Sequence, residues 1–176
     1  MTAPRQLSLL PKEHGAYGQM AFPLATALAV AGVNVPALLI VVAVIAGFLA
    51  HEPLLVVAGM RGRRARREQI GAAVPWLAAL TVVTVAAGAA AVMVMPPDVR
   101  WSVVVPLAPA GGVFAAILAG HEKSWLAEVA VALAFSLAAV PVCLAVGAAF
   151  EIGASVAVAF AGHFVLGTLS VRAIIL

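Results

Sequence analysis

The chain has 176 residues, of which 65% are hydrophobic and 10% are charged, with a formal net charge of +3. So much apolar surface cannot be buried in one soluble core of this length, and the composition therefore indicates an integral membrane protein. The positive charge is concentrated in the segment 61–67, without an accompanying aromatic or basic face, which argues against nucleic acid as a partner. Cys143 is the only cysteine, so an intrachain disulfide or a Cys-x-x-Cys metal site is excluded.

Six apolar runs are each long enough to cross a bilayer as a helix. They are expected at about 15–33, 36–59, 71–95, 101–120, 125–148 and 152–174. The fold class predicted is an all-α, polytopic transmembrane bundle that forms a single transmembrane domain over residues 1–176. Pro23 interrupts the first run, and Asn34-Val-Pro36 separates it from the second. The longest connection is the segment 61–68, which we expect to be a loop.

The distribution of lysine and arginine predicts the orientation, because positively charged segments are retained on the cytoplasmic side. With six spans, one side carries Arg5, Lys12, Arg61, Arg63, Arg64, Arg66, Arg67, Lys123 and Arg172. Only Arg100 falls on the other side. Both termini are therefore predicted to be cytoplasmic, in a cytoplasmic membrane.

Pairs of glutamate and histidine recur at the predicted cytoplasmic ends of the spans. His51-Glu52 and His121-Glu122 repeat one order, Glu13-His14 has the reverse order, and His163 lies in the last span. Ionisable groups are costly in hydrocarbon, so a set at one depth is a functional-site hypothesis. Imidazole and carboxylate groups suit Zn, Mn, Fe or, for the oxygens, Mg. The candidate metal ligands are Glu13, His14, His51, Glu52, His121, Glu122, Glu128 and His163.

Helical geometry limits the simplest metal site, because adjacent residues point about 100° apart on a helix. His51 and Glu52 would bind one ion together only if Pro53 distorted the helix. A proton relay and a structural role remain alternatives, the latter with Glu52 meeting a nearby arginine and Glu122 meeting Lys123. A haem held by two histidines is a further alternative.

The turn between the fourth and fifth spans has two expected features. Ser124 is predicted to be the N-cap of the fifth helix. If the two helices were continuous, His121 and Glu128 would share a face.

The arginine segment has two interpretations. It fixes topology and touches anionic lipid headgroups, or Arg61, Arg63 and Arg64 clamp a phosphate or carboxylate near Glu52. If the protein is an enzyme, Glu52 is the candidate acid/base or metal ligand, and His51 is the candidate that orients it. The ligand would then be an anionic small molecule or lipid.

Three motifs resemble the YwiC-like family of bacterial membrane proteins. They are Leu10-Pro-Lys-Glu-His-Gly-Ala-Tyr17, then His51-Glu-Pro-Leu-Leu55 followed by Gly62-Arg-Arg-Ala-Arg66, and the terminal Gly167-Thr-Leu-Ser-Val-Arg172. The resemblance implies a small polytopic membrane protein and marks Glu13, His14, His51 and Glu52 as signature positions. It implies no reaction.

A more distant similarity in layout is to UbiA-like prenyltransferases, whose acidic motifs at cytoplasmic helix ends hold magnesium diphosphate. Histidines stand here in place of the Asn-Asp-x-x-x-Asp motifs. The predicted function is therefore a cytoplasm-facing Glu/His cluster that binds a divalent metal or an anionic lipid-like ligand. A diphosphate-processing enzyme, or an accessory subunit of a membrane complex, is the alternative.

Overall fold

The computed structural model describes residues 9–11, 14–122 and 124–175 of the chain. These residues form helices joined by turns, and no strand occurs among them. In chain order the elements are α1 (His14–Ala31), α2 (Val35–Val57), α3 (Gly62–Val94), the 3-10 helix η1 (Pro97–Val103), α4 (Val104–Leu118), α5 (Trp125–Leu137), α6 (Ala139–Val146) and α7 (Phe150–Ile175). The predicted all-α fold is confirmed.

Five helical segments of the described chain are long and apolar enough to cross a membrane. They are Val35–Val57, Gly62–Val94, Pro97–Leu118, Trp125–Val146 and Phe150–Ser170. They match the second to sixth predicted spans. The first predicted span corresponds to α1, whose 18 residues fall just short of the ~20 that a hydrocarbon core requires. The chain is thus a multi-pass membrane protein, and the cytoplasmic placement of its termini stays a prediction.

The expected loop over residues 61–68 is the main error in the predicted elements. The turn occupies residues 58–61, and α3 begins at Gly62 and runs for 33 residues. Arginine, alanine and glutamate are good helix formers, and Arg64 pairs with Glu68 one turn later at 2.8 Å. At 1.5 Å per residue α3 is about 50 Å long, well beyond the ~30 Å hydrocarbon core.

The fifth predicted span, 125–148, is divided at Ala138 into α5 and α6. Pro141 explains the division, because proline has no N–H for the carbonyl four residues earlier and its ring clashes with that carbonyl. Cys143 lies in α6 and is fully buried. Gly147 then ends α6 with a φ of 88°, a left-handed conformation that glycine adopts without strain.

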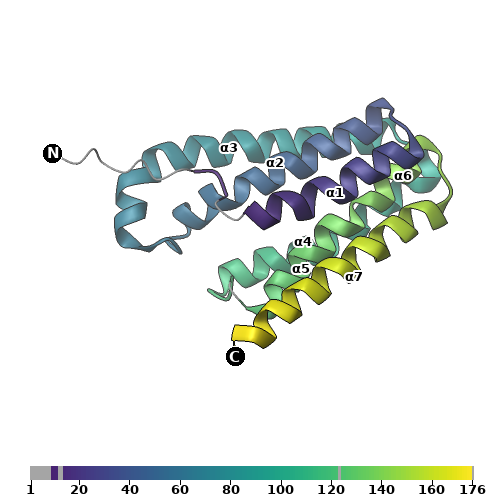
Figure 1. Ribbon diagram of the computed structural model, residues 1–176. Coiled ribbons are helices and arrows are strands. Elements are labelled where there is room, and N and C mark those ends of the chain that lie inside the picture. Colours follow the sequence, from purple (N-terminus) through teal and green to yellow (C-terminus); the bar gives the residue numbers. More distant parts are fainter. Residues whose placement is uncertain (1–8, 12–13, 123, 176) are drawn as a thin grey trace.

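The helices form two groups with α1 between them (Figure 1). α2 and α3 make a long hairpin along one side, while α4, α5 and α7 lie together on the other. α1 packs against α2, α5, α6 and α7. The groups converge at one end, which we call the α6 end (residues 32–34 and 146–149), and diverge toward the other, the arginine end (residues 58–67 and 119–122).

Close backbone packing fixes the α6 end. A Cβ atom placed on Gly153 of α7 would lie 3.1 Å from the Cα of Val140 and 3.2 Å from the Cβ of Cys143. Small residues let membrane helices approach this closely. Asn34 adds hydrogen bonds: its Oδ1 accepts from the N–H of Ala37 as the N-cap of α2, and its Nδ2 donates to the carbonyl of Ala145 at 2.6 Å.

Candidate functional site

Glu52 is the most deeply buried charged side chain of the described residues, with 3% of the residue exposed. It lies near the end of α2, five residues before Val57. Arg61 of the α2–α3 turn donates to both carboxylate oxygens, from Nε to Oε1 at 2.9 Å and from Nη2 to Oε2 at 2.6 Å. This two-point pairing satisfies the buried carboxylate, which would otherwise be costly.

Glu122 approaches the same guanidinium from the opposite group of helices. Its Oε1 lies 3.6 Å from Nη1 of Arg61. The α4–α5 turn places it there: Gly120 has a φ of 74°, and the N–H of His121 bonds to the carbonyl of Ala116 at 2.8 Å. The other oxygen, Oε2, is buried and accepts no hydrogen bond within the described part of the chain.

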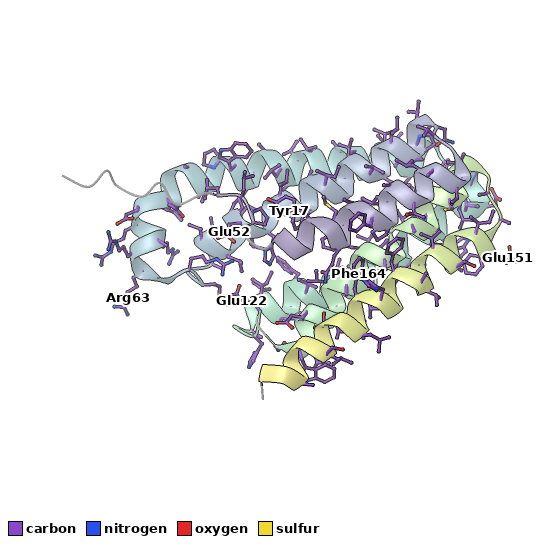
Figure 2. The ribbon with its side chains drawn as sticks, in the orientation of Figure 1. Tyr17, Glu52, Arg63, Glu122, Glu151 and Phe164 are labelled. Carbon is purple, nitrogen blue, oxygen red and sulfur yellow. The ribbon has the colours of Figure 1, made fainter. Side chains whose placement is uncertain are left out.

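The site therefore contains two carboxylates that share one guanidinium, with a formal charge of −1. We call Glu52, Arg61 and Glu122 the carboxylate site. Glu52 and Glu122 both lie at the arginine end, whereas Glu151 lies at the opposite end (Figure 2). Arg61 bonds more closely to Glu52 than to Glu122, so the contact between the two helix groups is the weaker of its two pairings.

Three aromatic rings pack together one helical turn from Glu52. Phe48 lies one turn before Glu52 on α2 and is 7% exposed. Its ring makes edge contacts with Tyr17 of α1, at 4.9 Å between centroids, and with Phe135 of α5, at 5.6 Å. The Tyr17 hydroxyl donates to the carbonyl of Pro11 at 3.0 Å, which ties the N-terminal segment to this cluster. These rings hold α1, α2 and α5 together beside the charges.

Comparison with known proteins adds a family. The family model described as YwiC-like protein matches residues 10–143, about three quarters of the chain. The chain belongs to the YwiC-like family. No curated protein and no solved structure matches it significantly.

The matched segment of this YwiC-like protein contains the complete carboxylate site and the aromatic cluster, whereas α7 lies outside it. The family assignment therefore covers Glu52, Arg61 and Glu122 together and leaves out His163.

The predicted metal ligands of the YwiC-like protein are only partly brought together. Glu13 lies outside the described residues, and His14 begins α1 with a side chain that is also outside them. His163 is exposed on α7 and touches the ring of Phe164. Among the residues that the structure describes, no three His, Cys, Asp or Glu side chains form a group that could hold a metal ion. What converges is the pair Glu52 and Glu122, with half-buried His51 next to Glu52 in the chain.

The condition of one prediction is not met, and a related prediction is confirmed. His121 and Glu128 do not share a continuous helix, because α4 ends at Leu118 and a turn that includes Gly120 follows. Glu128 lies in the first turn of α5. Ser124 is the N-cap of α5 as expected, and its Oγ accepts from the N–H of Ala127 at 3.2 Å.

The three arginines that were predicted to clamp a phosphate do not lie together: Arg61 lies apart from Arg63 and Arg64. Arg61 faces Glu52, but two carboxylates occupy its donors. Arg63 and Arg64 lie on the exposed first turns of α3, where Arg63 lies well away from Glu52 (Figure 2) and Arg64 pairs with Glu68. They point elsewhere because residues 62–68 form a helix, not a loop that could fold back.

Sequence reasoning missed Tyr17, Phe48 and Phe135. A signal was available for two of them, since Phe48 stands one helical turn before Glu52 and Tyr17 ends the first family motif. Phe135 had no such signal, because its role depends on how α5 packs against α2.

Proposed function

We propose that this protein binds a hard divalent cation, such as Mg²⁺ or Mn²⁺, at the carboxylate site. One observation carries the proposal: Oε2 of Glu122 is buried and lacks a hydrogen-bond donor among the described residues. A buried acceptor without a partner costs free energy, and more so when it is charged. A divalent cation at this oxygen would offset that cost and change the formal charge of the site from −1 to +1.

The chemistry of the donors favours a hard cation over Zn²⁺ or Fe²⁺. Mg²⁺ is bound through one or two carboxylates and keeps several of its waters, so it does not need a complete cage of protein ligands. Structural zinc usually requires four protein ligands, and catalytic zinc three. The pair Glu52 and Glu122 fits the first pattern.

The two unequal pairings of Arg61 suggest how a cation would enter. Arg61 holds Glu52 with two short hydrogen bonds, whereas it meets Glu122 through an ion-pair contact of 3.6 Å. A cation would bind to Glu122 first, while Arg61 remains paired with Glu52. Because Glu122 lies on the α4–α5 turn and Arg61 on the α2–α3 turn, occupancy would alter the contact between the two helix groups.

The arginine end is proposed to face the cytoplasm of a bacterial cell. Arg63, Arg64, Arg66 and Arg67 all lie on the exposed first turns of α3 at this end. Positively charged segments that flank spans are retained inside. The bound cation would then exchange with the cytoplasmic pool.

A role in phosphate chemistry is less well supported. Arg61, the arginine nearest to Glu52, already pairs with two carboxylates and would have to leave them to hold a phosphate.

Binding of Mn²⁺ to the purified protein in lipid nanodiscs, measured by electron paramagnetic resonance, tests the proposal. The wild-type protein is expected to bind Mn²⁺, and Mg²⁺ should compete. Glu122→Gln should weaken binding at least tenfold, because it removes the charged oxygen. Glu68→Gln is the matched control, since this exposed carboxylate lies at the same end and pairs with Arg64. Equal Mn²⁺ binding by wild type and Glu122→Gln would contradict the proposal.

A further inference from the structure

An apolar pocket of about 340 Å³ lies beside α2 and α3, separate from the carboxylate site. Leu9 and Leu10 of the N-terminal segment, Leu49 of α2, and Trp76 and Leu80 of α3 line it. Its volume lies within the range of roughly 300–1,000 Å³ that is common for ligand pockets. A ligand that fills it must be apolar where it contacts these residues.

The length of α3 places this pocket near a membrane interface. About 20 residues of a helix cross the hydrocarbon core, and counting back from Val94 reaches the neighbourhood of Pro75 and Trp76. The first turns of α3 then extend into the headgroup region. Trp76, 53% exposed, suits that boundary because tryptophan side chains concentrate at membrane interfaces.

The same face of α3 carries positive charge beyond the pocket. Arg66 lies fourteen residues before Leu80, close to four helical turns, so both lie near one side of the helix. It is about 15 Å along the axis from Trp76, and its side chain lies against Gly59 of the α2–α3 turn.

The charged residues near the pocket predict that the ligand carries negative charge. The first two turns of α3 hold four exposed arginines and one exposed glutamate. They are Arg63, Arg64, Arg66, Arg67 and Glu68. This is a formal excess of three positive charges, and guanidinium groups bind phosphate oxygens in a two-point geometry.

From this juxtaposition we infer that α3, together with Leu9 and Leu10, forms a binding site for an anionic phospholipid. Its phosphate lies at Arg66, which is on the pocket's side of α3, and the neighbouring arginines add to the positive field there. One acyl chain enters the pocket between Leu49, Trp76 and Leu80. A lipid meets both requirements because its headgroup and chain are covalently joined. A zwitterionic lipid fits the pocket equally well but is attracted less by the arginines. This inference does not depend on cation binding at the carboxylate site.

Quenching of Trp76 fluorescence by lipids with brominated acyl chains tests the inference directly. The full-length protein with Trp101→Phe and Trp125→Phe keeps Trp76 as its one tryptophan. It is reconstituted in phosphatidylcholine vesicles that contain equal mole fractions of brominated phosphatidylglycerol or brominated phosphatidylcholine. Brominated phosphatidylglycerol should quench Trp76 more strongly than brominated phosphatidylcholine does. Adding 0.5 M NaCl should reduce this difference in quenching.

Three variants locate the site. Arg66→Gln is expected to lower the preference for phosphatidylglycerol about fivefold, the effect of one surface arginine near an anionic membrane. Arg67→Gln, on the opposite side of α3 from the pocket, should lower it less. Leu80→Phe fills part of the pocket and should weaken quenching by brominated phosphatidylglycerol. Arg100→Gln removes the same charge near the α6 end and should leave the preference unchanged. Equal quenching by both lipids, or an unchanged preference in Arg66→Gln, would overturn the inference.

Discussion

The two ends of this bundle are held together by different kinds of contact. At the α6 end, Gly153 lets α7 approach the backbone of α6, and Asn34 bonds the α1–α2 turn to the carbonyl of Ala145. At the arginine end, the contact between the helix groups includes the ion pair of Arg61 with Glu122. Backbone packing is insensitive to ions in solution, whereas a charge pair can be changed by a cation. The arginine end is therefore the one that a ligand can alter.

The largest expected loss of stability comes from Arg61→Gln, which removes the ion pairs at the arginine end. The variant leaves the carboxylate of Glu52 buried without its guanidinium partner. Removing one partner of a buried ion pair costs about 3 kcal/mol of unfolding free energy. Unfolding in mixed detergent micelles measures this loss. Mn²⁺ should bind this variant more tightly than wild type, because two carboxylates are then available, and should restore part of its stability. A variant as stable as wild type without Mn²⁺ would show that the pair is not needed.

Gly153→Ala disturbs the helix packing at the α6 end and is expected to lower the free energy of unfolding by about 2 kcal/mol. The added methyl group would lie 3.1 Å from the Cα of Val140, and overpacking of this kind usually costs about 1–3 kcal/mol. Gly162→Ala is the matched control on the same helix, since no heavy atom other than those of its chain neighbours and the adjacent turns of the α7 backbone lies within 4 Å of the added carbon among the described residues. It should be neutral or slightly stabilising. Mn²⁺ should not rescue Gly153→Ala, and a rescue would contradict the proposed difference between the ends.

Asn34→Ala is expected to cost about 1.5 kcal/mol, because it removes the N-cap of α2 and the bond to Ala145. Asn34→Ser keeps a capping oxygen but loses the amide donor, so it should recover part of the loss. The same unfolding measurement compares the three proteins. If Asn34→Ser is as unstable as Asn34→Ala, the contact with Ala145 matters more than the cap.

The smallest effect is expected from Arg64→Gln, three residues from Arg61. Arg64 is almost fully exposed, and its pair with Glu68 is an exposed pair within one helix. Both the unfolding midpoint and the Mn²⁺ affinity should match those of wild type. A large loss of stability, or a large gain in Mn²⁺ affinity, would show that the arginine end depends on total positive charge and not on the position of Arg61.

Much of the fold could be predicted, because apolar runs of about twenty residues have few alternatives in a membrane. The turn at Asn34 and the cap at Ser124 were predicted from local hydrogen-bonding chemistry, and the structure confirms both. The helical start of α3 was not predicted, because five arginines in seven residues resemble a solvated loop, although most residues of the segment favour a helix.

The candidate site could be predicted only in part. Glu52 stood out because a carboxylate near the end of an apolar helix needs a partner, and a nearby arginine was an obvious choice. That Glu122 would share this arginine could not be predicted, because it depends on how the α4–α5 turn packs against the α2–α3 turn. Sequence spacing does not encode the packing of helices that are distant along the chain.

The burial of Cys143 has a practical consequence. The chain has one thiol, and it lies fully inside the bundle, in α6 against α7. A cysteine introduced at an exposed position at either end would therefore be the one thiol that a membrane-impermeant maleimide reaches. The native cysteine can stay in place, so sealed vesicles would reveal which face of the membrane each end occupies without disturbing the packing of α6.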